Sequence, residues 1–366
     1  MFEFVTKPKM MLEGIQRLGL KGAVTHGVRH ASTAAGVTLL GPFQIRINPT
    51  DVICNHACPM CYLQYLPPED LRSEKIRERN QWMLLDDYKQ LFDGMPPGLT
   101  EVNIVGGGEP LAHPDVVGIM EEVKSRNLRG YLMTNGTLMK PKISERMVQI
   151  GWNRTRCSVH SGDAETFKAI HGVNKFDTLK ENMKAFHKFR VEANKQKSCV
   201  FSIVNVLQKE NLHNIEAMFD FAEEVGVDYV EFELIVPLSI DKMLTIEELT
   251  HIKATMAELV PKYSFASNAE RFLAKIFKEA EIGRDNTFYR PANRCSVGYD
   301  SAFIKAMGEV VPCCFSDEVM GNVKNQTFEE IWYGDKYRKF RKRLMAGNFA
   351  KYCSDNRCKY ETFLHN

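Results

Sequence analysis

The sequence predicts an α/β fold built on a parallel sheet. Short runs rich in apolar and β-branched residues alternate with segments of helical periodicity between residues 41 and 240. The strand-like runs lie at residues 43–47, 101–105, 130–134, 153–160, 200–206 and 228–236. Because strands that alternate with helices form parallel units, the loops that follow them should meet at one edge of the sheet. Ligands bind at that edge in folds of this kind.

Helical segments separate the strands and supply the crossovers. Their apolar spacing predicts helices at residues 82–92, 116–125, 143–150, 164–170, 179–189 and 215–224. Asp163 directly precedes one of them and is the expected N-cap, because its carboxylate can accept a hydrogen bond from a free N–H of the first turn. Asn135-Gly136 is a turn pair that ends the third strand.

The regions outside the alternating part have a different character. Residues 1–40 are expected to be an N-terminal extension. A short basic amphipathic helix is expected at 10–18, and it packs on its own domain, docks on a partner or lies on a membrane. Residues 241–290 are a helical linker, with helices expected at 246–259 and 269–282. Residues 291–366 form a small second domain that buries little core alone, so we expect bound metal to stabilise it.

Two elements are expected in the second domain. Short strand-like pieces flank Met307-Gly308 and predict a hairpin. A single helix over residues 328–344 carries many basic side chains. These charges fall on more than one face, which favours a solvated surface helix over a site for an acidic partner.

Composition narrows the class of protein. The 366 residues are 44% hydrophobic and 26% charged, enough for a large core and more than one domain. A net charge of +2 gives no reason to expect nucleic acid or a membrane surface as a partner. No signal peptide and no apolar run of about 18 residues, the length of a membrane span, is present. The ten cysteines are clustered, which favours metal ligation in a reducing compartment, so we expect a cytoplasmic protein.

The loop after the first strand carries three cysteines at the spacing C-x3-C-x2-C: Cys54, Cys58 and Cys61. Soft thiolate ligands favour an iron–sulfur cluster over oxygen-loving metals. Three ligands also leave one metal position open, whereas a closed structural site would use four. The alternatives are core thiols or a zinc site, for which His56 is the nearest further ligand although its spacing is unfavourable.

The loop after the second strand reads Gly106-Gly107-Gly108-Glu109-Pro110. Glycines let backbone approach a ligand closely, although a plain tight turn would also explain them. Together with the cysteine motif and the Tyr62 that follows it, this loop resembles the second motif of the radical S-adenosylmethionine (radical SAM) enzymes. The resemblance covers roughly residues 41–240, with both motifs in the family's order and on matching strand ends.

The resemblance implies a partial (β/α)6 TIM-like barrel with a small C-terminal iron–sulfur domain. Cys54, Cys58 and Cys61 would hold a 4Fe-4S cluster with one free iron, which the amino and carboxylate groups of S-adenosylmethionine (SAM) chelate. An electron from a donor such as flavodoxin or ferredoxin would then cleave SAM to a 5′-deoxyadenosyl radical. That radical abstracts a hydrogen atom from the substrate.

The resemblance also implies which residues contact SAM. These are Tyr62, Gly107, Gly108, Glu109, Asn135, Ser158 and Asn205. Glu109 would lie near the ammonium group, Ser158 near the carboxylate and ribose, and Asn205 along the adenine and ribose. For Asn135, Ser158 and Asn205 a structural role in a turn or in the core remains equally open.

Candidate catalytic residues are fewer. His160 stands where many relatives have an aspartate, so it contacts substrate or is a hydrogen-bonded structural residue. Cys157, Cys199 and Cys314 are candidate hydrogen-atom donors to a product radical. Side chains alternate along a strand, so Cys157 should point away from the mouth if Ser158 points in. Cys314 is therefore the preferred donor.

The C-terminal cysteines resemble the SPASM and twitch extensions of radical SAM enzymes. Cys295, Gly308 and Cys313 read C-x12-G-x4-C, and Cys353-x4-Cys358 closes the set. The dense cysteine run of a full two-cluster SPASM domain is missing. We therefore expect one auxiliary 4Fe-4S cluster, or alternatively zinc, on four thiolates. Its ligands would be Cys295, Cys313, Cys353 and Cys358, with Cys314 left over or in place of Cys313.

Three functional hypotheses follow. The first is an enzyme that oxidises, epimerises or decarboxylates a sugar- or aminocyclitol-like small molecule in specialised biosynthesis. The second is a peptide or protein maturase of the SPASM type, although residues 1–40 are few for the recognition domain such enzymes often carry. The third, a non-catalytic electron-transfer protein, is disfavoured by the Gly-Gly-Glu-Pro motif, since an electron carrier needs no SAM site.

Overall fold

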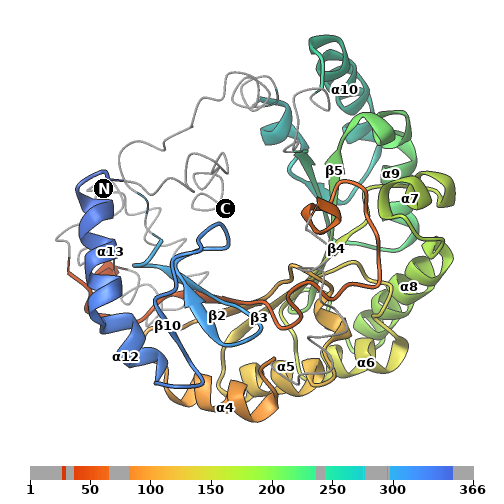
Figure 1. Ribbon diagram of the computed structural model, residues 1–366. Coiled ribbons are helices and arrows are strands. Elements are labelled where there is room, and N and C mark those ends of the chain that lie inside the picture. The colour runs from red at the N-terminus through yellow and green to blue at the C-terminus, as the bar shows by residue number, and fades with distance from the viewer. Residues whose placement is uncertain are drawn as a thin grey trace.

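A computed structural model describes residues 27–29, 37–65, 82–235, 244–274, 276, 295 and 297–348. Its centre is one sheet with the strand order β10-β9-β8-β1-β2-β3-β4-β5-β6-β7. The sheet curls into an open ring, and the helices lie along its outer side (Figure 1). The predicted α/β architecture, a partial barrel with a C-terminal extension, is confirmed.

The six predicted strands all form. They are β1 (Gln44–Ile47), β2 (Glu101–Ile104), β3 (Arg129–Thr134), β4 (Arg154–Ser158), β5 (Val200–Leu207) and β6 (Tyr229–Leu234). Neighbours pair in parallel throughout, from Gln44 opposite Glu101 to Leu207 opposite Leu234. Their carboxyl ends therefore share one edge. A short strand that was not predicted, β7 (Ala266–Ser267), continues the sheet in parallel beyond β6.

The predicted crossover helices also form. They are α4 (Leu85–Asp93), α5 (Val116–Ser125), α6 (Pro141–Gln149), α7 (Ala164–His171), α8 (Phe176–Glu192), α9 (Ile215–Glu224) and, after β6, α10 (Ile246–Leu259). Short 3-10 helices are η1 (Tyr62–Tyr65), η2 (Pro110–Ala112), η3 (Lys209–Asn214) and η5 (Val260–Lys262). Asp163 caps α7 as expected, since its side chain accepts a 2.8 Å hydrogen bond from the Thr166 N–H. The helix expected at 10–18 and most of the second part of the one expected at 269–282 lie outside the described residues, whereas residues 269–274 are helical.

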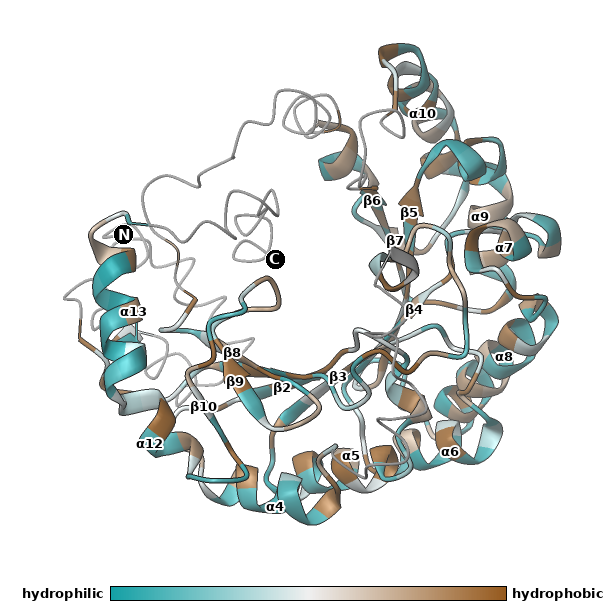
Figure 2. Cartoon of the chain, in the orientation of Figure 1, coloured by the Kyte–Doolittle hydropathy of each residue, from teal (hydrophilic) through white to brown (hydrophobic). Residues whose placement is uncertain are grey.

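One core joins the sheet to the helices. On β1 and β2 the buried positions alternate, so that Ile45, Ile47, Val102 and Ile104 face the helix layer. The helices accordingly carry their apolar residues on the inner side and polar residues on the outer side (Figure 2). Gln44 and the other residues of opposite parity face the inside of the ring.

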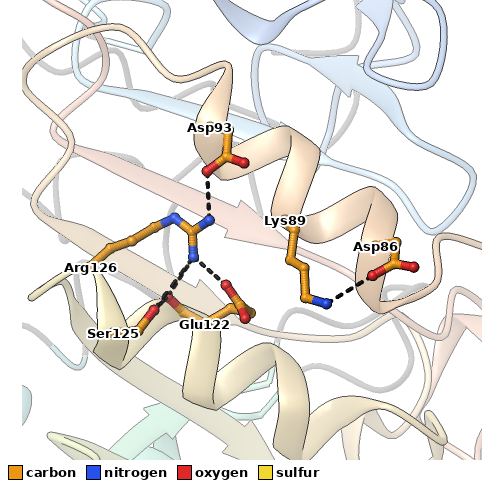
Figure 3. A network of polar contacts seen from close by, with 6 residues as sticks. All are labelled: Asp86, Lys89, Asp93, Glu122, Ser125 and Arg126. Carbon is orange, nitrogen blue, oxygen red and sulfur yellow. Dashed lines mark hydrogen bonds and ion pairs between the residues drawn. The ribbon is translucent and has the colours of Figure 1, made fainter.

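An ion pair joins the C-terminal ends of α4 and α5 at the outer surface (Figure 3). Arg126, directly after α5, donates to the Asp93 carboxylate over 2.6 Å and to Glu122 of its own helix. Lys89 and Asp86 form a further pair within α4 at 2.8 Å. Pairs of this kind at a surface contribute about 0–1 kcal/mol each.

The C-terminal strands extend the same sheet. β8 (Ser301–Ile304) pairs in parallel with β1, and β9 (Glu309–Val311) pairs antiparallel with β8. The hairpin expected around Met307-Gly308 is confirmed, and Gly308 adopts a φ of +87° that favours glycine. β10 (Gly321–Asn322) follows β9 antiparallel.

The prediction of a single helix over 328–344 is wrong, because the segment forms α12 (Phe328–Tyr333) and α13 (Asp335–Met345). Gly334 between them is extended, with φ −69° and ψ 167°. A Cβ at this position would lie 2.7 Å from the Glu330 carbonyl oxygen, so the break requires glycine. The basic side chains Lys336, Arg338, Lys339 and Lys342 of α13 are exposed, whereas Arg341 is buried.

Within the described ranges, no helix combines the length and the apolar character needed to cross a bilayer.

Candidate active site

The cysteine loop leaves β1 at the carboxyl edge of the sheet. Cys54, Cys58 and Cys61 are half-buried and form no disulfide. Backbone hydrogen bonds fold the loop on itself, from the Ile53 N–H to the Thr50 carbonyl (2.9 Å) and from the Cys61 N–H to the Cys58 carbonyl (2.9 Å). The three thiols thus lie together in one compact loop, as the spacing predicts.

The environment of these thiols calls for a cation. Burial raises the pKa of all three, and that of Cys58 to about 12, with the neighbouring Cys54 and Cys61 as further causes. Ionising all three thiols is therefore unfavourable unless positive charge lies beside them. Iron in a cluster supplies that charge, and one backbone N–H, that of His56, already points at the Cys54 sulfur over 3.4 Å. The donor set fits a 4Fe-4S cluster with one iron free of protein ligands.

The glycine loop after β2 packs directly on the cysteine loop. A Cβ on Gly108 would lie 2.0 Å from the Ile53 carbonyl oxygen. A Cβ on Gly107 would lie 2.4 Å from the Tyr62 hydroxyl and 2.6 Å from the Asp51 carbonyl oxygen. The glycines are thus required by contact between the two loops, whereas the sequence suggested close approach to a ligand or a plain tight turn.

Glu109 joins the ends of β2 and β3. It is 2% exposed, and its carboxylate accepts hydrogen bonds from the Thr134 hydroxyl (2.6 Å) and from the backbone N–H groups of Asn135 (2.7 Å) and Leu111 (3.0 Å). Burial nevertheless raises the pKa of Glu109, against the effect of these donors. A carboxylate has about four lone-pair positions, so one remains for a ligand such as the predicted ammonium group.

Asn135 connects the end of β3 to the cysteine loop. Its side-chain amide donates to the Asn55 side-chain carbonyl over 2.8 Å and points at the Cys54 sulfur over 4.0 Å. Asn135 Oδ1 accepts from the Thr137 N–H (3.0 Å) and the Thr137 hydroxyl (2.7 Å). The structure therefore brings Asn135 to the thiols, where the sequence placed it only at the same mouth.

A pair of histidines that the sequence did not bring together lies beside Cys58. His171 ends α7, and its Nδ1 lies 3.5 Å from the Cys58 sulfur and 3.3 Å from His56 Nδ1. Burial lowers the pKa of His56 to about 3 and that of His171 to about 4, so both imidazoles are neutral. His171 is 113 residues from Cys58, and only the fold joins them. The one local signal is Gly172, whose Cβ would meet the Ala57 carbonyl oxygen at 2.4 Å.

His160 continues this row of rings. It follows β4 with a φ of +58°, an unusual conformation for a residue other than glycine. Its Nδ1 accepts a 3.0 Å hydrogen bond from the Val206 N–H, so the hydrogen of the neutral ring is on Nε2. The ring stacks on that of His171, with centroids 5.3 Å apart. His160 is 5% exposed and hydrogen-bonded to β5. Of its two predicted roles, substrate contact and structural hydrogen bonding, this placement favours the structural one.

The remaining candidates on β4 and β5 divide between the two faces of the sheet. Ser158 is half-buried on the inner face, and Cys157 is fully buried on the helix side, as strand alternation predicts. Burial raises the pKa of Cys157, and it raises that of Cys199 to about 11, so both behave as core thiols. Asn205 has the parity of Phe201 and Ile203, which face the helices. That placement argues against the predicted contact of Asn205 with SAM.

The C-terminal hairpin packs on the cysteine loop. Asn48 donates its N–H to the Ile304 carbonyl over 2.9 Å, and Ile53 shares a small apolar cluster with Ala306. Cys295 and Cys313 are half-buried and Cys314 is exposed, whereas Cys353 and Cys358 lie outside the described residues.

Tyr62 lies where the two regions meet. Burial raises the pKa of its phenol to about 12, and the nearby Cys314 thiol adds to the effect.

Comparison with known proteins agrees with this geometry. The profile described as "Radical SAM superfamily" matches residues 49–222, and the profile described as "Iron-sulfur cluster-binding domain", SPASM, matches residues 295–359. The chain belongs to the radical SAM superfamily. It is a radical SAM enzyme with a C-terminal SPASM domain, and its cofactors are a 4Fe-4S cluster, SAM and auxiliary iron–sulfur. All five C-terminal cysteines fall within the SPASM match.

Among curated proteins, the chain is similar to the AdoMet-dependent heme synthase of Nitratidesulfovibrio vulgaris. The two are 26% identical over 309 residues, which cover 79% of this chain and 78% of the relative. The Methanosarcina barkeri enzyme of the same name is 28% identical over 270 residues, covering 70% and 75%. A probable GTP 3′,8-cyclase of Sulfurisphaera tokodaii is 26% identical over 227 residues, covering 60% and 67%.

Solved radical SAM structures share the fold. Streptococcus suis SuiB bound to its precursor peptide SuiA aligns with a TM-score of 0.60 at 19% identity, covering 87% of this chain and 71% of SuiB. The enzyme anSMEcpe with bound AdoMet aligns with a TM-score of 0.58 at 16% identity, covering 87% and 90%. At these identities the likeness concerns the fold alone.

Proposed function

We propose that this radical SAM enzyme removes a hydrogen atom from a small polar molecule. One contact carries the proposal. The glycine loop after β2 packs backbone against backbone on the cysteine loop after β1, at Gly108 and Ile53. This contact puts the predicted cluster ligands and the predicted SAM-binding loop side by side at the carboxyl edge of the sheet.

The residues of the chain would divide the work at this edge. When bound, the cluster and SAM supply a 5′-deoxyadenosyl radical that takes a hydrogen atom from substrate. Cys54, Cys58 and Cys61 would hold the cluster. Tyr62, Gly107, Gly108, Glu109, Asn135 and Ser158 would line the SAM site; Asn205, predicted with them, is less favoured on its placement.

The curated relatives favour a small substrate over a peptide. Heme synthase and GTP 3′,8-cyclase are named for small molecules, and they match at 26–28% identity over most of their length. The peptide-bound structures match at lower identity and inform on the fold alone.

The inner face of the barrel supports a polar substrate. Arg154 and Arg156 of β4 point inward, as do Glu231 and Glu233 of β6. Arg156 pairs with Glu231 (2.9 Å) and with Glu233 (2.5 Å). These charged side chains can exchange their ion pairs for hydroxyl, amino or acidic groups of a ligand. An apolar ligand would remove water from the charges without replacing its hydrogen bonds, which is unfavourable. A sugar- or aminocyclitol-like molecule fits this lining.

The reaction type follows from what receives the substrate radical. We infer that Cys295, Cys313, Cys353 and Cys358 hold an auxiliary 4Fe-4S cluster that positions the substrate or accepts its electron in an oxidation or decarboxylation. In an epimerisation, the exposed Cys314 would return a hydrogen atom. Cys314 is favoured over Cys157, which lies in the core, and over His160, which is tied to β5.

A peptide maturase remains the second candidate. Its support is the shared fold with SuiB bound to a precursor peptide and with anSMEcpe bound to AdoMet. For either substrate we propose a cytoplasmic enzyme that is reduced by flavodoxin or ferredoxin. We also keep the division into an extension (1–40), a barrel (41–240), a linker (241–290) and an auxiliary-cluster domain (291–366) as a proposal.

The decisive experiment is anaerobic reconstitution followed by turnover with dithionite and SAM. We expect about eight irons per chain, from two 4Fe-4S clusters, and formation of 5′-deoxyadenosine. A Cys54/Cys58/Cys61 triple alanine variant should retain about four irons and should form no 5′-deoxyadenosine. Continued cleavage of SAM by that variant would overturn the proposal.

The substrate class is tested by deuterium transfer. Deuterated aminocyclitols and sugars should pass deuterium to 5′-deoxyadenosine, and deuterated peptides should not. The reverse result would favour the maturase.

A further inference from the structure

The contact between His56 and His171 is unusual because neither of the two facing Nδ1 atoms carries a hydrogen. His171 Nε2 lies 2.7 Å from the Val159 carbonyl oxygen, which can only accept, so the hydrogen of this ring is on Nε2. Nδ1 of His171 is therefore a bare lone pair. It faces His56 Nδ1 over 3.3 Å.

The hydrogen of His56 is also on its far nitrogen. His56 Nε2 lies 3.0 Å from the Thr137 hydroxyl oxygen. That hydroxyl has one hydrogen and lies 2.7 Å from Asn135 Oδ1, an oxygen fixed as the acceptor of the Thr137 N–H. Two oxygens at 2.7 Å need a hydrogen between them, so Thr137 donates to Asn135 and accepts from His56 Nε2–H. His56 Nδ1 is then a second lone pair, aimed at the first.

Two opposed lone pairs with a sulfur beside them form the donor set of a metal ion. A tetrahedral zinc ion places two nitrogen donors about 3.4 Å apart and a nitrogen and a sulfur about 3.6 Å apart. The observed separations are 3.3 Å for the two Nδ1 atoms and 3.5 Å between His171 Nδ1 and Cys58 Sγ. All three donor atoms lie within 4.8 Å of one another. A Cys58 thiol hydrogen could satisfy one lone pair but not both.

The outer contacts are also those of metal ligands. Metal-binding histidines usually donate their other N–H to a carbonyl or similar acceptor, which fixes the ring. Here Val159 O fixes His171 and the Thr137 hydroxyl fixes His56. Phe167 packs on both rings, with centroids 4.2 Å from His171 and 5.8 Å from His56.

We propose that His56 Nδ1, Cys58 Sγ and His171 Nδ1 bind one divalent cation of the Zn²⁺ type in chains that lack the iron–sulfur cluster. Imidazole and thiolate donors suit zinc better than Mg²⁺ or Ca²⁺. The site and the cluster exclude each other, because both use the Cys58 sulfur. Zinc would hold the cysteine loop against the end of α7 until the cluster is built.

The test is zinc stoichiometry of the cluster-free full chain, measured anaerobically by competition with a chromophoric chelator. Wild type should bind one zinc more than His171→Asn and one more than His56→Ala. Cys54→Ala should bind as many zinc ions as wild type, because Cys54 is a predicted cluster ligand but not one of the three proposed zinc ligands. The C-terminal cysteines are the same in all four proteins, so their zinc cancels.

Two results would overturn the proposal. Equal zinc in wild type and both histidine variants would show that the rings share a proton or water instead. Loss of one zinc in Cys54→Ala would show a three-thiolate site. Because His171 is buried and its variant risks misfolding, the half-buried His56 provides the second test, with thermal melting of each variant as the control for folding.

A fourth variant tests the hydrogen bond between His56 and Thr137. Thr137→Val removes the acceptor of His56 Nε2–H and should weaken zinc binding at His56, Cys58 and His171 about 10–100-fold. Unchanged affinity would contradict the assigned proton positions on which the proposal depends.

Discussion

The backbone N–H of Glu109 donates a 2.8 Å hydrogen bond to the carbonyl oxygen of Ile53. Glu109 belongs to the glycine motif and Ile53 directly precedes the first cysteine of the cluster motif. The two family motifs are therefore one structural unit, and damage to either loop should reach the other.

Gly108→Ala tests this unit. Its Cβ would lie 2.0 Å from the Ile53 carbonyl oxygen, a backbone atom that can yield only if the cysteine loop moves. We expect a loss of stability of about 1–3 kcal/mol and a fall from about eight irons to about four after reconstitution. Iron analysis and 5′-deoxyadenosine yield are the measurements.

Gly118→Ala is the matched control for that substitution. Its Cβ would meet only the flexible Leu85 side chain, at 3.0 Å, within the α5 helix. It should keep full iron content. If Gly108→Ala behaves in the same way, the contact between the loops is not required for cluster binding.

Cys313 and Cys314 should respond differently to alanine substitution. Cys313 is half-buried and Cys314 is exposed, so we expect Cys313 to be the auxiliary ligand. Cys313→Ala should lose about four irons, whereas Cys314→Ala should keep about eight. Cys199→Ala, in the core, controls for loss of any thiol. The opposite iron counts would assign the ligand to Cys314 and remove it as a hydrogen donor.

Arg190 should matter far more to stability than Arg126. Arg190 is fully buried, pairs with Asp228, and donates to the Cys199 carbonyl over 2.6 Å. Arg190→Ala removes the ion-pair partner of Asp228, which keeps the Phe201 N–H as a donor, and leaves the Cys199 carbonyl without its arginine; it should cost about 3–5 kcal/mol. Arg126→Ala, at the surface, should cost less than about 1 kcal/mol. Similar shifts in unfolding midpoint for the two variants would contradict this ranking.

The Asp163 cap of α7 should make a pH-dependent contribution to the stability of the folded chain. Burial acts to raise the pKa of Asp163, but hydrogen bonds from Thr166 and Asn214 outweigh it and hold the pKa below its usual value. A depressed pKa stabilises the folded chain above the ordinary aspartate value, and the contribution is lost as pH falls through the folded pKa.

Asp163→Asn separates charge from capping. Asn keeps a capping oxygen, so the variant should lose stability mainly at neutral pH. The difference from wild type should shrink only as pH falls below the ordinary aspartate value and through the depressed native pKa. A series of thermal melts from neutral pH downward measures this. Asp163→Ala should lose about 0.5–2 kcal/mol more than Asn at neutral pH. A wild type–Asn difference that is constant with pH would show that the charge is unimportant.

Much of the fold was predictable because its signals are local. Strands such as Arg129–Thr134 are short runs bounded by turn residues, and the apolar spacing of Ile215–Glu224 is helical on its own. The Asp163 carboxylate predicts a helix cap, and Gly308 predicts a turn because it has no Cβ. The cysteine and glycine motifs were likewise visible because all their residues lie within one loop each.

The rest depends on contacts between distant parts of the chain. Near His171 the sole local signal is Gly172, which does not identify Cys58 as a neighbour. The curvature of the sheet brings the end of α7 to the cysteine loop. The buried role of Glu109 depends on donors from β3. The break at Gly334 was missed because one glycine within a helical pattern is often tolerated.

The pairing of β1 with β8 has a consequence for how the chain is made. β1 (Gln44–Ile47) is synthesised early, but its partner Ser301–Ile304 emerges only after most of the chain. At about 5–20 residues per second, that edge of β1 waits on the ribosome for tens of seconds with bare N–H and C=O groups. A stalled or shortened chain would keep this edge open to pairing with another molecule. The C-terminal region thus covers this edge of β1, and nascent chains need protection until it arrives.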